Sequence, residues 1–347
     1  MRKGEIMPAI LLWNIEHSSG YQDVFSSKNA FINEVIGICV REFDVSVVIL
    51  LEVTTETSVD QFAYNHGMTC SVLGEGTALK YAILTKGKHE HSDVTAYFPS
   101  FTNKPRGVAY VRAAAVGIPP LLVTHIKSDQ GMSGNACLKD ICAQMPENMH
   151  TSSPKWPGSG VIALADWNLE ADEARNVTRS SAGTIVAPDE PTRYAKIAAN
   201  QIMQPSEKAK ILDYACVFGT LQQNHALTAF VPDVYYLRSI LGLLDVYLKR
   251  VQQTVTTLGA SLSENEASVL RALSVNVPLV RLNAQLAKQE ALQEEKSGLD
   301  RAVELISAFR ERLANRSRLD EQDRQVLHQL ITQAGMGPDH LPVILRW

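Results

Sequence analysis

The chain has 347 residues, of which 45% are hydrophobic and 20% charged, with a formal net charge of −4 and a mean hydropathy of −0.07. This composition excludes a disordered or collagen-like chain, and the acidic balance predicts no strong nonspecific affinity for nucleic acid. The longest apolar stretch, residues 45–51, is far shorter than the roughly 20 residues that cross a bilayer. We therefore expect no membrane span, and the short apolar run after the basic start predicts no secretion signal.

The cysteines predict a cytoplasmic protein. There are five of them, scattered along the chain and mostly set in apolar surroundings. Cys137 and Cys142 have neither the spacing of a zinc site nor a second pair nearby. We expect reduced thiols in the core of a protein from a reducing compartment.

Between residues 8 and 230 the sequence predicts many short strands. Apolar runs of four to nine residues, rich in Val, Ile and aromatic residues and bounded by turn residues, are typical of strands. In chain order the runs are AILLWNI, VSVVILLEV, ALKYAILT, GVAYVRAAAVGI, PLLVTHI, GVIALADWN, ILDYACVF and HALTAFV. Residues 28–43 instead repeat apolar side chains at helical spacing. Strands with interspersed helices indicate a layered α/β or α+β domain.

From about residue 233 to residue 335 the apolar spacing becomes helical. Ser263 with Glu266 predicts a capping box that opens one helix, Pro278 the start of the next, and Asp320 the cap of a last one. The final residues, DHLPVILRW, are strand-like again, so the helices are predicted to be inserted. We expect one domain made of residues 1–230 plus 336–347, and an inserted helical subdomain, a hairpin or a bundle, at residues 231–335.

Most of the predicted strands carry a polar side chain at one end. These residues are Asn14, Glu52, His125, Asp166, Asn168, Asp213, Asp339 and His340. A carboxylate after an apolar strand lies at the rim of a sheet, where it stays solvated at little cost. Several such rims at one end of packed sheets would gather these groups in one pocket.

Such a pocket suits the attack of water on a phosphate ester. A hard cation such as Mg²⁺ prefers oxygen ligands, among them carboxylates, water and phosphate oxygens. It stabilises the negative charge that develops in the transition state by several kcal/mol. A carboxylate or imidazole must also hold and deprotonate the attacking water.

Six motifs in this chain resemble those of the endonuclease/exonuclease/phosphatase superfamily, and they occur in the family's order. They are LLWNIEH, VVILLEV, THIKSD, ALADWNLE, ILDYACV and PDHLPVIL. The chain departs from the family's pattern at Leu51, Ala165, Trp167 and Pro338, which puts the substrate in doubt more than the reaction class. The resemblance implies an α+β fold, a four-layered α/β/β/α sandwich of two packed mixed sheets. It also implies Mg²⁺ or Mn²⁺ as the cofactor.

The resemblance also implies a role for each polar residue. Glu52 and Asn14 would hold or neighbour the metal, with Asp339 close by. Asp166 would align or deprotonate the attacking water, and Asn168 would bind a phosphate oxygen.

The imidazoles and basic residues complete that site. Asp213 would orient His340, which would act as acid, base or transition-state donor. His125 would be a second imidazole near the phosphate, and Lys127 or Arg106 could add positive charge. His225 is a rival for the terminal histidine, but it lacks the preceding Asp and the following Pro-Val of the motif. His17, His66, His89 and His91 are interpreted as loop residues.

The function expected from these residues is a metal-dependent phosphoesterase, a nuclease or phosphodiesterase with nucleic acid as its substrate. Two alternatives stay open. The same site serves an inositol-phosphate or lipid-headgroup phosphatase or phosphodiesterase. The chain could also be a partner-binding protein with a decayed catalytic domain. The helical insert could bind a protein partner, self-associate or cap the site, or it could be a hairpin that buries its own apolar stripes.

Overall fold

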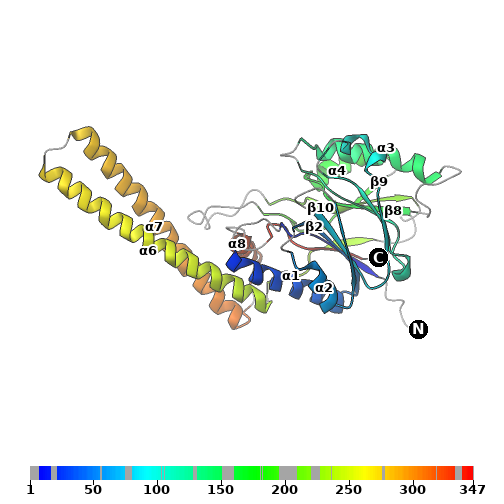
Figure 1. Cartoon of the computed structure of the whole chain (residues 1–347), viewed down its shortest axis with the longest axis horizontal. Coiled ribbons are helices and arrows are strands. Elements are labelled where there is room, and N and C mark those ends of the chain that lie inside the picture. Colours follow the sequence, from blue (N-terminus) through cyan, green and yellow to red (C-terminus); the bar gives the residue numbers. More distant parts are fainter. Residues whose placement is uncertain are drawn as a thin grey trace.

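The computed structural model has two packed sheets, with helices on both outer faces and a long helical hairpin that projects from one side (Figure 1). It describes residues 8–16, 22–54, 57–74, 80–102, 104, 106–127, 131–150, 160–179, 181, 183–194, 209–219, 227–235, 237–275, 278–317, 319–332 and 338–346.

The first sheet has the strand order β11-β12-β1-β2-β4-β3 and is mixed, because β1 and β2 are parallel and the other pairs antiparallel. Its strands are β1 (Ala9–Asn14), β2 (Val45–Val53), β3 (Thr69–Leu73), β4 (Lys80–Thr85), β11 (Thr228–Phe230) and β12 (Val343–Arg346). The last strand of the chain therefore lies beside the first one.

The second sheet has the order β5-β6-β7-β8-β10-β9, and again only one pair, β7 with β8, is parallel. Its strands are β5 (Glu90–Asp93), β6 (Ala109–Arg112), β7 (Leu121–His125), β8 (Gly160–Asp166), β9 (Gly183–Val186) and β10 (Asp213–Gly219). The two sheets thus repeat one plan, in which a central parallel pair is flanked by antiparallel strands.

The central strand β2 shows why these residues form a sandwich. All nine of its residues are buried, as expected for a strand covered on both faces. Val47, Ile49 and Leu51 join the cluster between the two sheets, whereas Val48 and Leu50 face the helices. A run of β-branched and aliphatic residues, interrupted only by Ser46 and Glu52, fills both layers at once.

Helices cover both outer faces, so the molecule has four layers (Figure 1). The first sheet carries α1 (Gln22–Glu42) and α2 (Val59–Asn65), and the second carries α3 (Gly134–His150) and α4 (Ala171–Thr178). Short 3₁₀ helices lie at η1 (Thr95–Tyr97), η2 (Pro99–Phe101) and η3 (Ala114–Val116). The predicted four-layered sandwich of two mixed sheets is confirmed.

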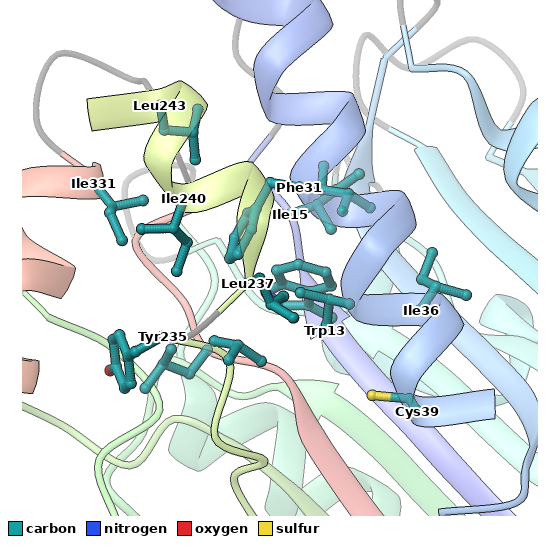
Figure 2. Close-up of a cluster of buried hydrophobic side chains, with 14 of the residues drawn as sticks. Trp13, Ile15, Phe31, Ile36, Cys39, Tyr235, Leu237, Ile240, Leu243 and Ile331 are labelled. Carbon is teal, nitrogen blue, oxygen red and sulfur yellow. The ribbon is translucent and has the colours of Figure 1, made fainter. Parts of the chain in front are cut away.

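Three further helices lie between β11 and β12: α6 (Arg238–Ser274), α7 (Leu279–Ala314) and α8 (Glu321–Thr332). The start of α6 packs beside α1 and α8, where Leu237, Ile240 and Ile331 contact the cluster around Trp13 and Phe31 (Figure 2). The predicted helical insertion is therefore present, and its base is continuous with the core of the first sheet. The domain boundaries at residues 231 and 335 stay a prediction.

The helix ends match the sequence analysis in two of three places. Helix α7 begins directly after Pro278, and the side chain of Asp320 accepts a hydrogen bond from the backbone of Asp323 at 2.8 Å. The capping box at Ser263 is wrong, because α6 is continuous from residue 238 to residue 274. The Ser263 hydroxyl donates instead to the carbonyl of Gly259 at 3.1 Å, which satisfies it inside a helix.

Candidate active site

The strand register brings the predicted polar residues together at one rim of the sandwich. In the second sheet Asp166, the last residue of β8, lies opposite both His125, which ends β7, and Asp213, which begins β10. In the first sheet Asn14 ends β1 opposite Leu51, the residue before Glu52. Parallel neighbours end at the same edge of a sheet, and the antiparallel β10 begins there, so five strands place polar side chains at one rim.

Two of these residues have an unusual backbone. Glu52 and Asn168 have φ angles of +56° and +45°, a left-handed conformation that non-glycine residues seldom adopt. At Glu52 the pairing of β2 with β4 shifts register between Leu50 and Val53, which is the irregularity of a β-bulge. Strained conformations of this kind cluster at functional sites, where they aim a side chain.

Asp166 is the centre of the hydrogen-bond network. Its Oδ2 accepts a hydrogen bond from Asn14 Nδ2 at 3.0 Å and lies 3.5 Å from His125 Nε2 and 3.6 Å from His340 Nε2. Its Oδ1 accepts from the backbone N–H of Asn168 at 3.0 Å. Burial alone would raise the pKa of this carboxyl, but the charge of His340 and the contacts of His125 hold it well below its ordinary value.

His340 is buried among three carboxylates. Its Nδ1 lies 2.6 Å from Asp213 Oδ2, and its Nε2 lies 3.5 Å from Asp339 Oδ1 and 3.6 Å from Asp166 Oδ2. Burial would lower the pKa of this imidazole, but the three carboxylates, Asp213 first, raise it to about 10. The ring is therefore an imidazolium at neutral pH, with Asp213 fixing its orientation.

The backbone around His340 is held from two sides. The indole N–H of Trp13 donates to the carbonyl of His340 at 2.9 Å, which links the core to the site. On the other side Arg193 forms an antiparallel β-bridge with His340, and the Leu341 N–H donates to the carbonyl of Thr192 at 2.7 Å. These contacts bring His340, 127 positions beyond Asp213 in the sequence, back to that partner.

The site is a polar cavity of about 270 Å³. The residues that line it are Asn14, Glu16, Glu52, His125, Lys127, Asp166, Asn168, Arg193, Asp339 and His340. Nε2 of His125 lies 3.3 Å from Glu52 Oε1, and Lys127 Nζ lies 3.7 Å from the same oxygen. The amide of Asn168 donates to the carbonyl of Ile126, which anchors that side chain.

The cavity has the donor set and charge that suit a hard divalent cation. Four carboxylates line it against two permanently basic side chains, Lys127 and Arg193. The His340 imidazolium adds a third positive charge, so the lining keeps an excess of one negative charge. Glu52, Asp339 and the amide of Asn14 offer the oxygen ligands that Mg²⁺ or Mn²⁺ prefers.

The sequence analysis missed two lining residues and included one that lies elsewhere. Glu16 follows Asn14 in the first motif, and Arg193 lies 3.2 Å through its Nε from Asp339 Oδ2. Arg193 comes from a connection without periodicity, so its sequence gave no signal. Arg106 is buried but does not line this cavity. It lies near Tyr81, where its charge opposes the burial that raises the pKa of that phenol to about 12.

Of the remaining histidines, His328 is buried with its Nε2 3.5 Å from the carbonyl of Asp339, and those interpreted as loop residues do not line the cavity or lie outside the described residues. His91 belongs to β5 and not to a loop, His66 follows the end of α2, and His89 lies between β4 and β5. His17 and His225 are outside the described residues, so the comparison of His225 with His340 stays a prediction.

No protein-family model and no curated protein matches the chain. Among solved structures, a truncated TDP2 from Caenorhabditis elegans is 16% identical, with 67% of this chain and 90% of that one covered and a TM-score of 0.45. A Danio rerio TDP2 in complex with a single-stranded DNA product is 14% identical, with 65% and 90% covered and a TM-score of 0.43. An endonuclease/exonuclease/phosphatase from Bacteroides vulgatus is 12% identical, with 65% and 90% covered and a TM-score of 0.41.

The fold that the resemblance implied, a sandwich of two mixed sheets with outer helices, is the fold of this chain. In the part of the chain that the structure describes, no helix is long and apolar enough to cross a membrane.

Proposed function

We propose that this protein is a metal-dependent phosphoesterase that hydrolyses phosphodiester bonds by the attack of water at the cavity around Asp166. One observation carries the proposal. A buried aspartate, an imidazolium and a set of oxygen ligands from both sheets meet in one cavity that has an excess of negative charge. A structural network would not need that excess, because buried charges are normally paired.

Asp166 is proposed to orient the attacking water. Its carboxylate stays charged at neutral pH, since its pKa lies well below the ordinary value. Because this carboxylate is a weak base, it would orient the attacking water through a hydrogen bond and would not retain the proton of that water. Asn14 and the backbone of Asn168 fix both of its oxygens.

His340 is proposed to donate from Nε2 to the phosphoryl oxygen or to the leaving alkoxide. Asp213 accepts the hydrogen bond from Nδ1, so the remaining N–H is directed at Asp166 and the cavity. An imidazolium placed there stabilises the charge that develops in the transition state and can give up its proton to the leaving group.

Glu52, Asp339 and Asn14 are proposed to hold Mg²⁺ or Mn²⁺. When bound, such an ion supplies Lewis-acid stabilisation of the phosphoryl charge. Atoms of Asp166, Asp213 and His340 also lie within 4.8 Å of one another. The 2.6 Å hydrogen bond between His340 and the fully buried Asp213 makes that trio a proton-donating unit instead of a metal site.

The basic residues are proposed to bind the phosphate. Lys127 and Arg193 line the cavity, and the second amide N–H of Asn168 can donate to a phosphate oxygen. Arg193 replaces Arg106 in the role suggested by the sequence, because Arg106 does not line the cavity.

The proposed substrate is a phosphodiester, whose single negative charge would face Lys127 and Arg193 in the cavity. Nucleic acid is the proposed substrate, and lipid-headgroup diesters have the same reacting group. A cytoplasmic location is proposed from the five free cysteines, of which four are buried.

Plasmid DNA, RNA, inositol phosphates and sphingomyelin, each with Mg²⁺, Mn²⁺ or EDTA, form the test panel. We expect cation-dependent hydrolysis of a diester, abolished in the His340→Ala variant. Hydrolysis that survives in that variant would contradict the site. An absence of hydrolysis together with an absence of metal binding by calorimetry would favour a partner-binding protein.

A further inference from the structure

The tip of the α6–α7 hairpin exposes large apolar side chains. Nine such side chains are exposed in the described part of the chain, and six of them lie on the last turns of α6 and the first turns of α7, with exposures between 43% and 80%. They are Leu270, Leu273, Val275, Leu279, Val280 and Leu286, and we call this set the apolar tip. Large apolar side chains left exposed together at one end of a hairpin mark an interaction surface.

The hairpin cannot cover these side chains itself, because its own interface near the tip is polar. The buried Asn265 donates to the carbonyl of Gln285 at 3.0 Å and to Gln289 Oε1 at 2.9 Å. Gln285 in turn donates to the hydroxyl of Ser268 at 3.0 Å. These bonds fix the register of the two helices and leave the leucines and valines outside. Nearer its base the hairpin does bury apolar side chains, among them Val251 and Leu299, but those of the apolar tip stay exposed.

The charges around the apolar tip have one sign. Residues 267–289 contain Arg271, Arg281 and Lys288 and no Asp or Glu. Acidic residues return directly beyond this stretch, at Glu266 on α6 and at Glu290 on α7. Apolar side chains bordered only by basic ones are complementary to the headgroups and acyl boundary of an anionic membrane.

The tip is presented away from the body of the protein (Figure 1). Helix α7 has 36 residues and is therefore about 54 Å long. Its other end is anchored, since Ile306 and Phe309 are buried in the core and Arg310 pairs with Asp245 of α6 at 2.5 Å. Glu34 of α1 accepts hydrogen bonds from the first backbone N–H groups of α6.

We propose that the apolar tip docks on the surface of an anionic membrane. The tip inserts into the headgroup region without spanning the bilayer. A second copy of the chain fits this surface less well, because tip-to-tip contact would bring the arginines of both copies together. The proposal does not depend on the chemistry of the cavity, which lies at the rim of the sandwich.

Flotation with vesicles tests the proposal on the full chain. We expect the protein to float with vesicles of phosphatidylcholine and phosphatidylserine, at least tenfold more strongly than with phosphatidylcholine alone, and to be released by high salt. The Leu273→Glu/Val280→Glu variant should bind at least tenfold more weakly. Tyr64→Glu is the control, because it adds one negative charge, half of that in the tip variant, at an exposed aromatic residue of α2 and should leave binding unchanged.

Three results would overturn the proposal. The first is that the protein does not bind the anionic vesicles. The second is that the tip variant binds as strongly as the wild type, with unchanged helix content by circular dichroism. The third is that the wild type binds neutral vesicles as strongly as anionic ones. Sedimentation equilibrium is the parallel measurement. A dimer of the wild-type chain that the tip variant converts to a monomer would assign the surface to self-association instead.

Discussion

The hydrogen bond between Asp213 and His340 allows a direct prediction for the Asp213→Asn substitution. Both groups are buried, with 2.6 Å between Oδ2 and Nδ1. The rise of the His340 pKa from 6.5 to about 10 is equivalent to about 5 kcal/mol in favour of the imidazolium, at about 1.4 kcal/mol per pKa unit. Asp213 is the largest source of this rise, ahead of Asp339 and Asp166.

Removal of the Asp213 charge should lower the pKa of His340 by roughly 1 to 3 units, the usual effect of one close opposite charge. At pH 8 the protonated fraction of His340 should then fall to between about 90% and about 10%, so hydrolysis should fall by up to about tenfold. A raised pKa stabilises the folded state below the unfolded value, and this stability is lost as pH rises through the folded value. The wild-type chain should therefore lose stability between pH 6.5 and about pH 10, and the variant less.

Nuclear magnetic resonance of ¹³C-labelled histidine measures this pKa directly in the metal-free protein. The spectrum of the His340→Gln variant identifies the resonance by its absence. A wild-type His340 that titrates near 6.5, or the same pKa in wild type and Asp213→Asn, would refute the reasoning.

Three further predictions concern Arg193, His328 and the base of the hairpin. Arg193→Gln should raise the KM for a phosphodiester about tenfold or more with a smaller effect on kcat, whereas an Asp172→Asn control on the surface of α4 should change neither. Burial lowers the pKa of His328 to about 4, so its neutral form is favoured in the folded state. As pH falls from 7 to 4, the wild type should therefore lose up to about 3 kcal/mol of stability relative to His328→Gln. Urea unfolding measures both pH curves, and parallel curves would contradict the prediction. Phe309→Ala should lower the free energy of unfolding by about 3 to 5 kcal/mol in the same assay. If the loss is no larger than that caused by Leu286→Ala, at an exposed position, the base of the hairpin is not part of the core.

The sandwich was predictable because its strands are buried on both faces. A run such as VSVVILLEV has too many β-branched residues and too few polar ones for any other element. The short edge strands β3, β5 and β9 were not predicted, since their exposed residues follow no apolar alternation. Helix α6 was divided wrongly at Ser263 because local capping signals cannot distinguish a helix start from a hydroxyl bonded inside a longer helix.

The polar set around the cavity could be expected because each member ends or begins an apolar strand. Arg193 could not be expected, since its place depends on two backbone bridges, to Lys210 and to His340, that only the folded chain creates. Arg106 resembled a site residue in sequence, but it is buried near Tyr81 and does not line the cavity. The basic charge at the tip of the hairpin was not predicted, because the insert as a whole contains equal numbers of basic and acidic residues.

The most direct measurement is the hydrolysis of bis(p-nitrophenyl) phosphate with Mg²⁺, because a generic diester does not require knowledge of the natural substrate. We predict activity that EDTA abolishes and added Mg²⁺ restores, that falls at least 100-fold in Asp166→Asn, and that is unchanged in Asp172→Asn. Equal hydrolysis by Asp166→Asn, or activity indifferent to EDTA, would contradict a metal-dependent site centred on Asp166.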